Sequence, residues 1–141
     1  MGRGLVGFAG TSARLLNLYA IMAVMALPPA ALALWRFGAV SGASAVLLGA
    51  FGAHGLAKHF EANPRHAATW ATAAQYHLVS SAVTLVAASQ RKVPAAALLA
   101  AGTVVFSGSL YALVLTNVKA LGAVTPVGGL LMVGGWLALL V

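Results

Sequence analysis

The chain has 141 residues, of which 62% are hydrophobic and only 6% are charged, and its mean hydropathy is +0.98. A water-soluble domain carries about 25% charged residues, so this composition excludes a soluble globular fold and indicates an integral membrane protein. The net charge of +7 does not indicate a nucleic-acid-binding protein, because the basic residues are scattered singly between apolar segments rather than clustered with aromatic side chains.

Charged residues divide the chain into long uncharged stretches. These stretches cover residues 15–35, 37–57, 67–90, 93–118 and 120–141. About 20 helical residues cross the ~30 Å hydrocarbon core, and a Lys or Arg at its centre costs about 2.5–3.5 kcal/mol. Each stretch is therefore long enough to cross a bilayer.

We expect residues 35–141 to form an all-α, four-helix transmembrane up-down bundle. A backbone in lipid must satisfy its own hydrogen bonds, which excludes open sheets, and short connections make neighbouring helices antiparallel. The expected helices cover residues 37–57, 67–89, 94–117 and 120–141. Pro94 suits the first turn of its helix, and Pro126 predicts that the last helix proper starts near Thr125.

Residues 1–34 are expected to form a separate hydrophobic and basic extension. Its apolar run is interrupted by Pro28-Pro29 and is joined to the next stretch only by Trp35-Arg36. Three interpretations stay open: a spanning helix with a tight turn, an interfacial or kinked helix that continues into the next one, and a targeting sequence. Arg3 and Arg14, near Ser and Thr and without acids, are typical of a mitochondrial presequence.

Small residues recur at helical spacing in the first of the four expected helices. The members of this small-residue face are Gly38, Ser41, Gly42, Ala45, Gly49 and Ala53. Lipid supplies no hydrophobic driving force between helices, so small side chains allow the close backbone approach that holds them together. The face indicates either packing inside the bundle or a site for a partner helix.

A second group of residues places polar atoms at membrane depth. Its members are His54, His77, Ser107, Ser109 and Tyr111. Intramembrane ionisable groups are candidates for function. His77 lies far from either helix end and needs a hydrogen-bond partner, for which Ser107, Ser109 and Tyr111 are candidates. His54 precedes Gly55, where it could cap the helix, bind a ligand or carry protons.

No enzymatic or cofactor site is expected. Glu61 is the only acid, which excludes paired carboxylates and a Ser-His-Asp triad. The chain has no cysteine, and the spacing of its four histidines matches no metal or haem pattern. His59 and His66 are expected to be solvated in the loop that holds Glu61. We therefore expect neither catalysis nor a bound metal or cofactor.

Several ordered motifs in residues 35–141 are similar to those of a known family. They are GAFGAHG at 49–55, Trp70 with Thr72-Ala73 and Gln75-Tyr76-His77, FSGSLY at 106–111, Leu121-Gly122 with TPVGG at 125–129, and Gly135-Trp136. In these motifs the chain resembles the domain of unknown function 423 family of small four-helix membrane proteins, which includes transmembrane protein 256. Family members often carry a second histidine three residues after the one that corresponds to His77. In this chain that position is Ser80, which argues against a His-x-x-His ligand pair.

The resemblance implies a four-helix fold without an established reaction, in a bacterial cytoplasmic membrane or in mitochondria. The basic extension favours the mitochondrial inner membrane. We expect a non-catalytic accessory subunit of a respiratory complex or supercomplex, whose partners are membrane lipids and other membrane-protein subunits. The alternative is a small transporter, channel or lipid- or quinone-binding protein that uses the polar group around His77.

Overall fold

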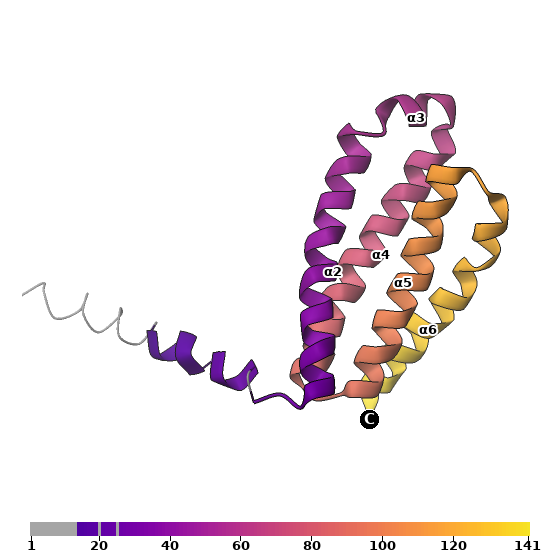
Figure 1. Cartoon of the computed structure of the whole chain (residues 1–141). Helices are drawn as coiled ribbons and strands as arrows, with labels where there is room; N and C mark the ends of the chain where they lie inside the picture. Colours follow the sequence, from indigo (N-terminus) through magenta and orange to yellow (C-terminus); the bar gives the residue numbers. More distant parts are fainter. Residues whose placement is uncertain (1–13, 20, 25) are drawn as a thin grey trace, which may run out of the picture.

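The computed structural model describes residues 14–19, 21–24 and 26–141, and these residues form helices and turns without strands. Four long helices make an antiparallel bundle (Figure 1). They are α2 (Pro29–His54), α4 (Pro64–Ser89), α5 (Val93–Thr116) and α6 (Thr125–Leu137). Three short elements complete the described part: α3 (Ala57–Ala62), η1 (Lys119–Ala123) and η2 (Ala138–Leu140). The expectation of an all-α membrane protein is confirmed.

Prolines mark the starts of all four long helices. Pro29, Pro64, Pro94 and Pro126 each occupy one of the first two helical positions. Proline is favoured there because its missing N–H would have no partner within the helix. The helix expected from residue 37 therefore starts at Pro29 instead and runs through Trp35 and Arg36.

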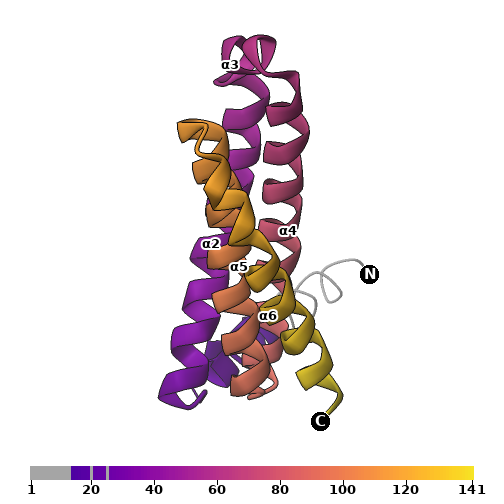
Figure 2. The same cartoon turned by 90° about the vertical axis from the view of Figure 1, so that its right-hand side faces the viewer.

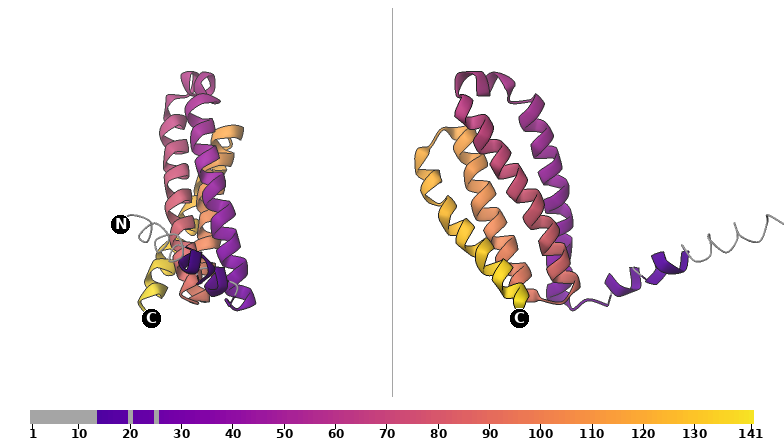
Figure 3. Two further views of the ribbon diagram at one scale, coloured as in Figure 1. Left: turned by 90° about the vertical axis from the view of Figure 1, so that its left-hand side faces the viewer. Right: turned by 180° about the vertical axis from the view of Figure 1, so that it is seen from behind.

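The tight turn considered at Trp35-Arg36 is thus absent, because both residues are helical. The chain bends before α2 instead, at Pro28, whose backbone is extended (φ −55°, ψ 149°). Residues 14–19 and 21–24 are helical and project away from the bundle in Figure 1 and in the right view of Figure 3. The presequence-like Arg3 lies outside the described residues.

Three helical segments are long and apolar enough to cross a membrane: α2, α5 and residues 119–140, which include α6. Helix α4 is more polar, yet it packs against both α2 and α5 along the bundle, so it crosses together with them. Thr72 and Gln75 of this helix are exposed, but Ser80, Ser81 and Thr84 are buried. Hydroxyl groups of this kind bond neighbouring backbone or helices inside membrane bundles.

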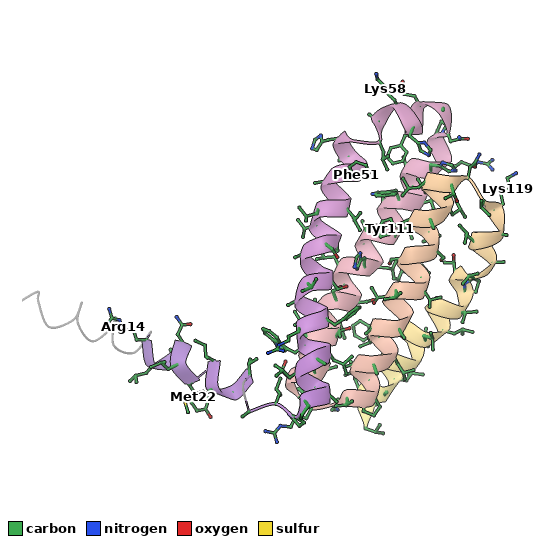
Figure 4. All side chains as sticks on the ribbon, in the orientation of Figure 1. Arg14, Met22, Phe51, Lys58, Tyr111 and Lys119 are labelled. Atoms are coloured by element: carbon green, nitrogen blue, oxygen red, sulfur yellow. The ribbon has the colours of Figure 1, made fainter. Side chains whose placement is uncertain are left out.

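The two ends of the bundle differ in what they hold. Figure 4 shows Lys58 and Lys119 at the end that carries α3, whereas the C-terminus lies at the other end, the end at which α2 starts (Figure 1). Helix α6 runs diagonally across α5 and reaches this second end (Figure 2). Lys92 Nζ donates a 2.5 Å hydrogen bond to the Leu139 carbonyl, which ties the start of α5 to the end of the chain.

Candidate functional site

The small-residue face of α2 lies against α4 over most of its length. A Cβ atom added to Gly38 would approach Leu85 to 3.0 Å, one added to Gly42 would meet Ser81 at 3.7 Å, and one added to Gly49 would meet Ala74 at 4.0 Å. Two more members of the face, Ser41 and Ala45, are buried, whereas Ala53 is exposed. Most of this face is therefore occupied inside the bundle and is not free to receive a partner helix.

Trp70 of α4 lies directly on Gly52 of α2. A Cβ at Gly52 would stand 2.3 Å from the indole ring, and the indole N–H donates a 2.8 Å hydrogen bond to the Leu48 carbonyl. On its other side the indole packs on Tyr111, with ring centroids 4.6 Å apart. Trp70 therefore contacts residues of both α2 and α5.

His77 lies at the centre of a polar cluster that joins the same three helices. Its Nε2 is 2.9 Å from Ser41 Oγ, and its Nδ1 is 3.4 Å from the Tyr111 hydroxyl. Ser41 Oγ is also 2.7 Å from Ser81 Oγ, and the Ser81 hydroxyl donates to the His77 carbonyl at 2.7 Å. We name Ser41, His77, Ser81 and Tyr111 the His77 cluster.

The hydrogen-bond donors and acceptors of the His77 cluster can be assigned from the His77 carbonyl, which is the last acceptor in this series of hydrogen bonds. A carbonyl oxygen only accepts, so Ser81 gives its single hydrogen to it. Ser41 must then donate to Ser81, which leaves His77 Nε2–H as the donor to Ser41. The lone pair of the imidazole is therefore on Nδ1, where it faces the Tyr111 hydroxyl.

A cavity of about 290 Å³ lies beside the His77 cluster, between α2, α4 and α5. His77, Ser41 and Tyr111 line it; Figure 4 shows Tyr111 within the bundle. Two further lining residues, Val40 and Val104, are 72% and 58% exposed. The cavity thus opens toward the lipid-facing surface, and its mostly apolar wall includes polar side chains of the His77 cluster.

The structure brings together some of the expected polar residues and separates others. Ser107 lines the same cavity, but its hydroxyl donates to the Ala73 carbonyl at 2.9 Å. Ser109 lies 2.9 Å from Thr125 Oγ1, on the side of α5 that faces α6. His54 is exposed at the end of α2. Of the candidate partners, only the Tyr111 hydroxyl is within bonding distance of the His77 ring.

The expectation that His59 and His66 are solvated is wrong. His66 is only 8% exposed, and the two imidazole rings stack with centroids 5.3 Å apart. His59 Nε2–H donates to the Val114 carbonyl at 2.7 Å and is 3.2 Å from His66 Nδ1. The short helix α3 turns back over the bundle end, so residues expected in a loop pack against α5. Within the described part of the chain, no three His, Asp or Glu side chains could hold a metal ion.

Two contributors to the site were not identified as such from the sequence. Ser41 was assigned to the small-residue face alone, although serine in such a stripe can also donate a hydrogen bond across helices. Ser81 follows His77 by four residues, the spacing at which two side chains share one helix face, and this spacing was the available signal.

Comparisons with known proteins agree with this architecture. The family model described as "Protein of unknown function (DUF423)" matches residues 48–129. The UPF0382 membrane protein SAB0533 of Staphylococcus aureus is 38% identical over 110 residues, which cover 74% of this chain and 88% of that protein. No solved structure matches the chain.

Relatives occur in other lineages as well. The UPF0382 membrane protein C1782.12c of Schizosaccharomyces pombe is 36% identical over 77% of this chain and 98% of its own length. The UPF0382 inner membrane protein YgdD of Escherichia coli is 39% identical over 74% of this chain and 84% of its own length. The chain therefore belongs to the DUF423 family of membrane proteins.

Proposed function

We propose that this protein binds a lipid-soluble molecule with a neutral hydroxyl head group in the cavity beside His77. The observation that supports it best is the 3.4 Å distance between the Tyr111 hydroxyl and His77 Nδ1, both at the cavity wall. This distance is long for a hydrogen bond from a hydroxyl. A ligand hydroxyl can insert there, because it accepts from Tyr111 and donates to the Nδ1 lone pair.

The surroundings of the cavity favour a ligand that arrives from the lipid. The opening is lined by exposed valines, and no charged side chain among the described residues lines the cavity. Its volume of about 290 Å³ is close to the lower end, ~300 Å³, of small-molecule sites. A head group with a hydroxyl and the size of about one ring, such as that of a quinol or a lipid alcohol, fits this description.

Thermal unfolding of the purified protein in detergent tests the proposal. Decylubiquinol and 1-dodecanol should raise Tm, because a ligand that binds only the folded state stabilises it by mass action. Dodecane, which lacks the head group, should not. An equal shift with dodecane would contradict the proposal.

Gly108→Leu provides a variant that fills the cavity without disturbing the bundle. No atom lies within 4 Å of a Cβ added at Gly108, which lines the cavity. Gly134→Leu is the matched control, since Gly134 lines none of the cavities described here and its Cβ would meet Leu98 at an ordinary 3.8 Å. The Tm shift should disappear in Gly108→Leu and persist in Gly134→Leu; a shift that persists in both would overturn the proposal.

A second proposal concerns partners. The helical residues 14–19 and 21–24 present apolar side chains that are more than half exposed. They are Leu15, Leu16, Leu18, Tyr19, Ile21 and Met22. We propose that this segment docks the protein, as a non-catalytic accessory subunit, onto a larger membrane complex. The basic extension favours the mitochondrial inner membrane, with a respiratory complex as the partner. The bacterial relatives favour a cytoplasmic membrane instead. We propose that the protein lies in a cytoplasmic membrane.

Purification in a mild detergent tests this second proposal. The wild-type protein should migrate with a defined larger complex from the cytoplasmic membrane fraction, and Leu16→Glu with Tyr19→Glu should release it as a small species. Gly134→Leu serves again as the control. Migration of the wild type as a free monomer would contradict docking.

A further inference from the structure

The end of the bundle that carries α3 contains a basic pocket. Its lining residues come from the start of α4 and from the connection between α5 and η1. They are Asn63, Pro64, Arg65, His66, Asn117 and Lys119, around a volume of about 410 Å³. Glu61, the single acid of the chain, is not among them. The pocket therefore carries positive charge without an acid in its wall.

His66 gives this pocket an unused donor. Its Nδ1 faces the N–H that His59 gives to the Val114 carbonyl, so Nδ1 is an acceptor and the N–H of the His66 ring is on Nε2. Nε2 makes no hydrogen bond with a described residue. Every fully buried side-chain nitrogen or oxygen among the described residues has a partner, so Nε2 is not fully enclosed, and His66 is one of the residues that line the pocket.

The start of α4 adds a second source of positive potential. This helix of 26 residues has no acid in its first turn, and its N-cap Asn63 makes no side-chain capping bond. The positive end of the helix dipole at such a position favours an anion. Together with Arg65 and Lys119, this arrangement matches the acceptor oxygens of a phosphate group.

An apolar groove lies on the same face of α4, deeper in the bundle. It has a volume of about 380 Å³ between α4 and α6, and Tyr76, Phe106, Gly129 and Trp136 are among its lining residues. Tyr76 follows Arg65 by 11 residues, which corresponds to about 16 Å along the helix and a rotation of only about 20°. The phosphate-binding end and the apolar groove are therefore aligned along the membrane normal.

We propose that this side of the bundle binds an anionic phospholipid, with its phosphate in the basic pocket and one acyl chain in the groove between α4 and α6. Basic pockets between membrane helices bind lipid head groups in this way. The site is separate from the cavity beside His77, because the two share no lining residue. Its test is therefore independent of the first proposal.

Thermal unfolding of the full chain in detergent, with added dioleoyl phosphatidylglycerol, tests the site. Half-maximal stabilisation should require at least ten times less phosphatidylglycerol than dioleoyl phosphatidylcholine. The double variant Arg65→Gln/Lys119→Gln should raise the required phosphatidylglycerol concentration about tenfold. Lys58→Gln is the matched control, because Lys58 is an exposed cation on α3 at the same end and does not line the pocket.

A groove-filling variant separates a lipid from free phosphate. A Cβ at Gly129 would meet only the Phe106 ring, at 3.8 Å, so Gly129→Leu fills the groove without a backbone clash. It should weaken stabilisation by phosphatidylglycerol at least fivefold, whereas Gly134→Leu should not. Lys119→Gln alone, at an exposed position, keeps the test decisive if the double variant fails to fold.

Three results would overturn the lipid site. Equal stabilisation by both lipids would show that the head-group charge is not recognised. An equal loss in Lys58→Gln would show a diffuse surface effect. Stabilisation by inorganic phosphate that matches the lipid and is unchanged in Gly129→Leu would show that the pocket takes free phosphate instead.

Discussion

Ser41 on α2 and His77 on α4 are joined Oγ to Nε2 at 2.9 Å across 36 residues of sequence. The serine that lets the two backbones approach is the same residue that satisfies the imidazole. Ser41 therefore contributes both to the close packing of α2 on α4 and to the hydrogen bond with His77, and a substitution at Ser41 affects both.

Ser41→Ala should destabilise the bundle. It removes the acceptor of His77 Nε2–H and leaves a polar group unpaired in an apolar interior, at a cost of about 1–2 kcal/mol. Ser44→Ala is the control, since the Ser44 hydroxyl bonds only the Ser41 carbonyl of its own helix. Unfolding in mixed micelles by a denaturing detergent measures both, and equal losses would contradict the role assigned to Ser41.

Tyr111→Phe should separate ligand binding from stability. The aromatic ring that packs on Trp70 is retained, and the hydroxyl lost makes only the 3.4 Å contact to His77. We expect the free energy of unfolding to change by less than about 0.5 kcal/mol. The rise in Tm that 1-dodecanol produces should become at least five times smaller. The control is Tyr76→Phe, on the other side of α4, which should change neither the free energy of unfolding nor the Tm shift with 1-dodecanol. An unchanged Tm shift in Tyr111→Phe would show that the Tyr111 hydroxyl does not bind the ligand.

Gly52→Ala should be harmful although it raises helix propensity. The new Cβ would stand 2.3 Å from the Trp70 ring, and overpacking of this kind costs about 1–3 kcal/mol. Gly108→Ala should instead be neutral or stabilising by up to about 1 kcal/mol, because nothing lies within 4 Å of its Cβ. The same unfolding titration compares the two, and equal behaviour would refute the close approach of α2 and α4.

Much of the fold follows from the sequence because lipid permits few alternatives. Uncharged lengths and the first-turn prolines Pro94 and Pro126 located three of the four long helices. The start of α2 was misplaced by eight residues, because Arg36 was read as a boundary although a helix continues through a charge at the membrane edge. A charged residue such as Arg36 indicates that its position lies near the membrane surface, but it does not indicate that the helix ends there.

The candidate site was harder to predict, because it depends on how the helices are rotated about their axes. The sequence indicates that His77 needs a partner, but only packing decides that Ser41 lies opposite it while Ser109 faces Thr125. Likewise, polar composition marked residues 58–66 as a solvated connection. The pairing of His59 with Val114 depends on α3 folding back over the bundle end, which no local pattern signals.

His59→Ala should loosen the end of the bundle. The substitution removes the 2.7 Å hydrogen bond to the Val114 carbonyl and the ring stacked on His66, and a buried bond of this type contributes about 0.5–1.5 kcal/mol. Hydrogen exchange should therefore accelerate in α3 and in the first turns of α4 while the centre of α5 stays protected. His54→Ala is the control, since His54 is exposed at the end of α2. If exchange is equally fast in both variants, His59 does not hold α3 against α5, and the donor assigned to His66 in the basic pocket loses its basis.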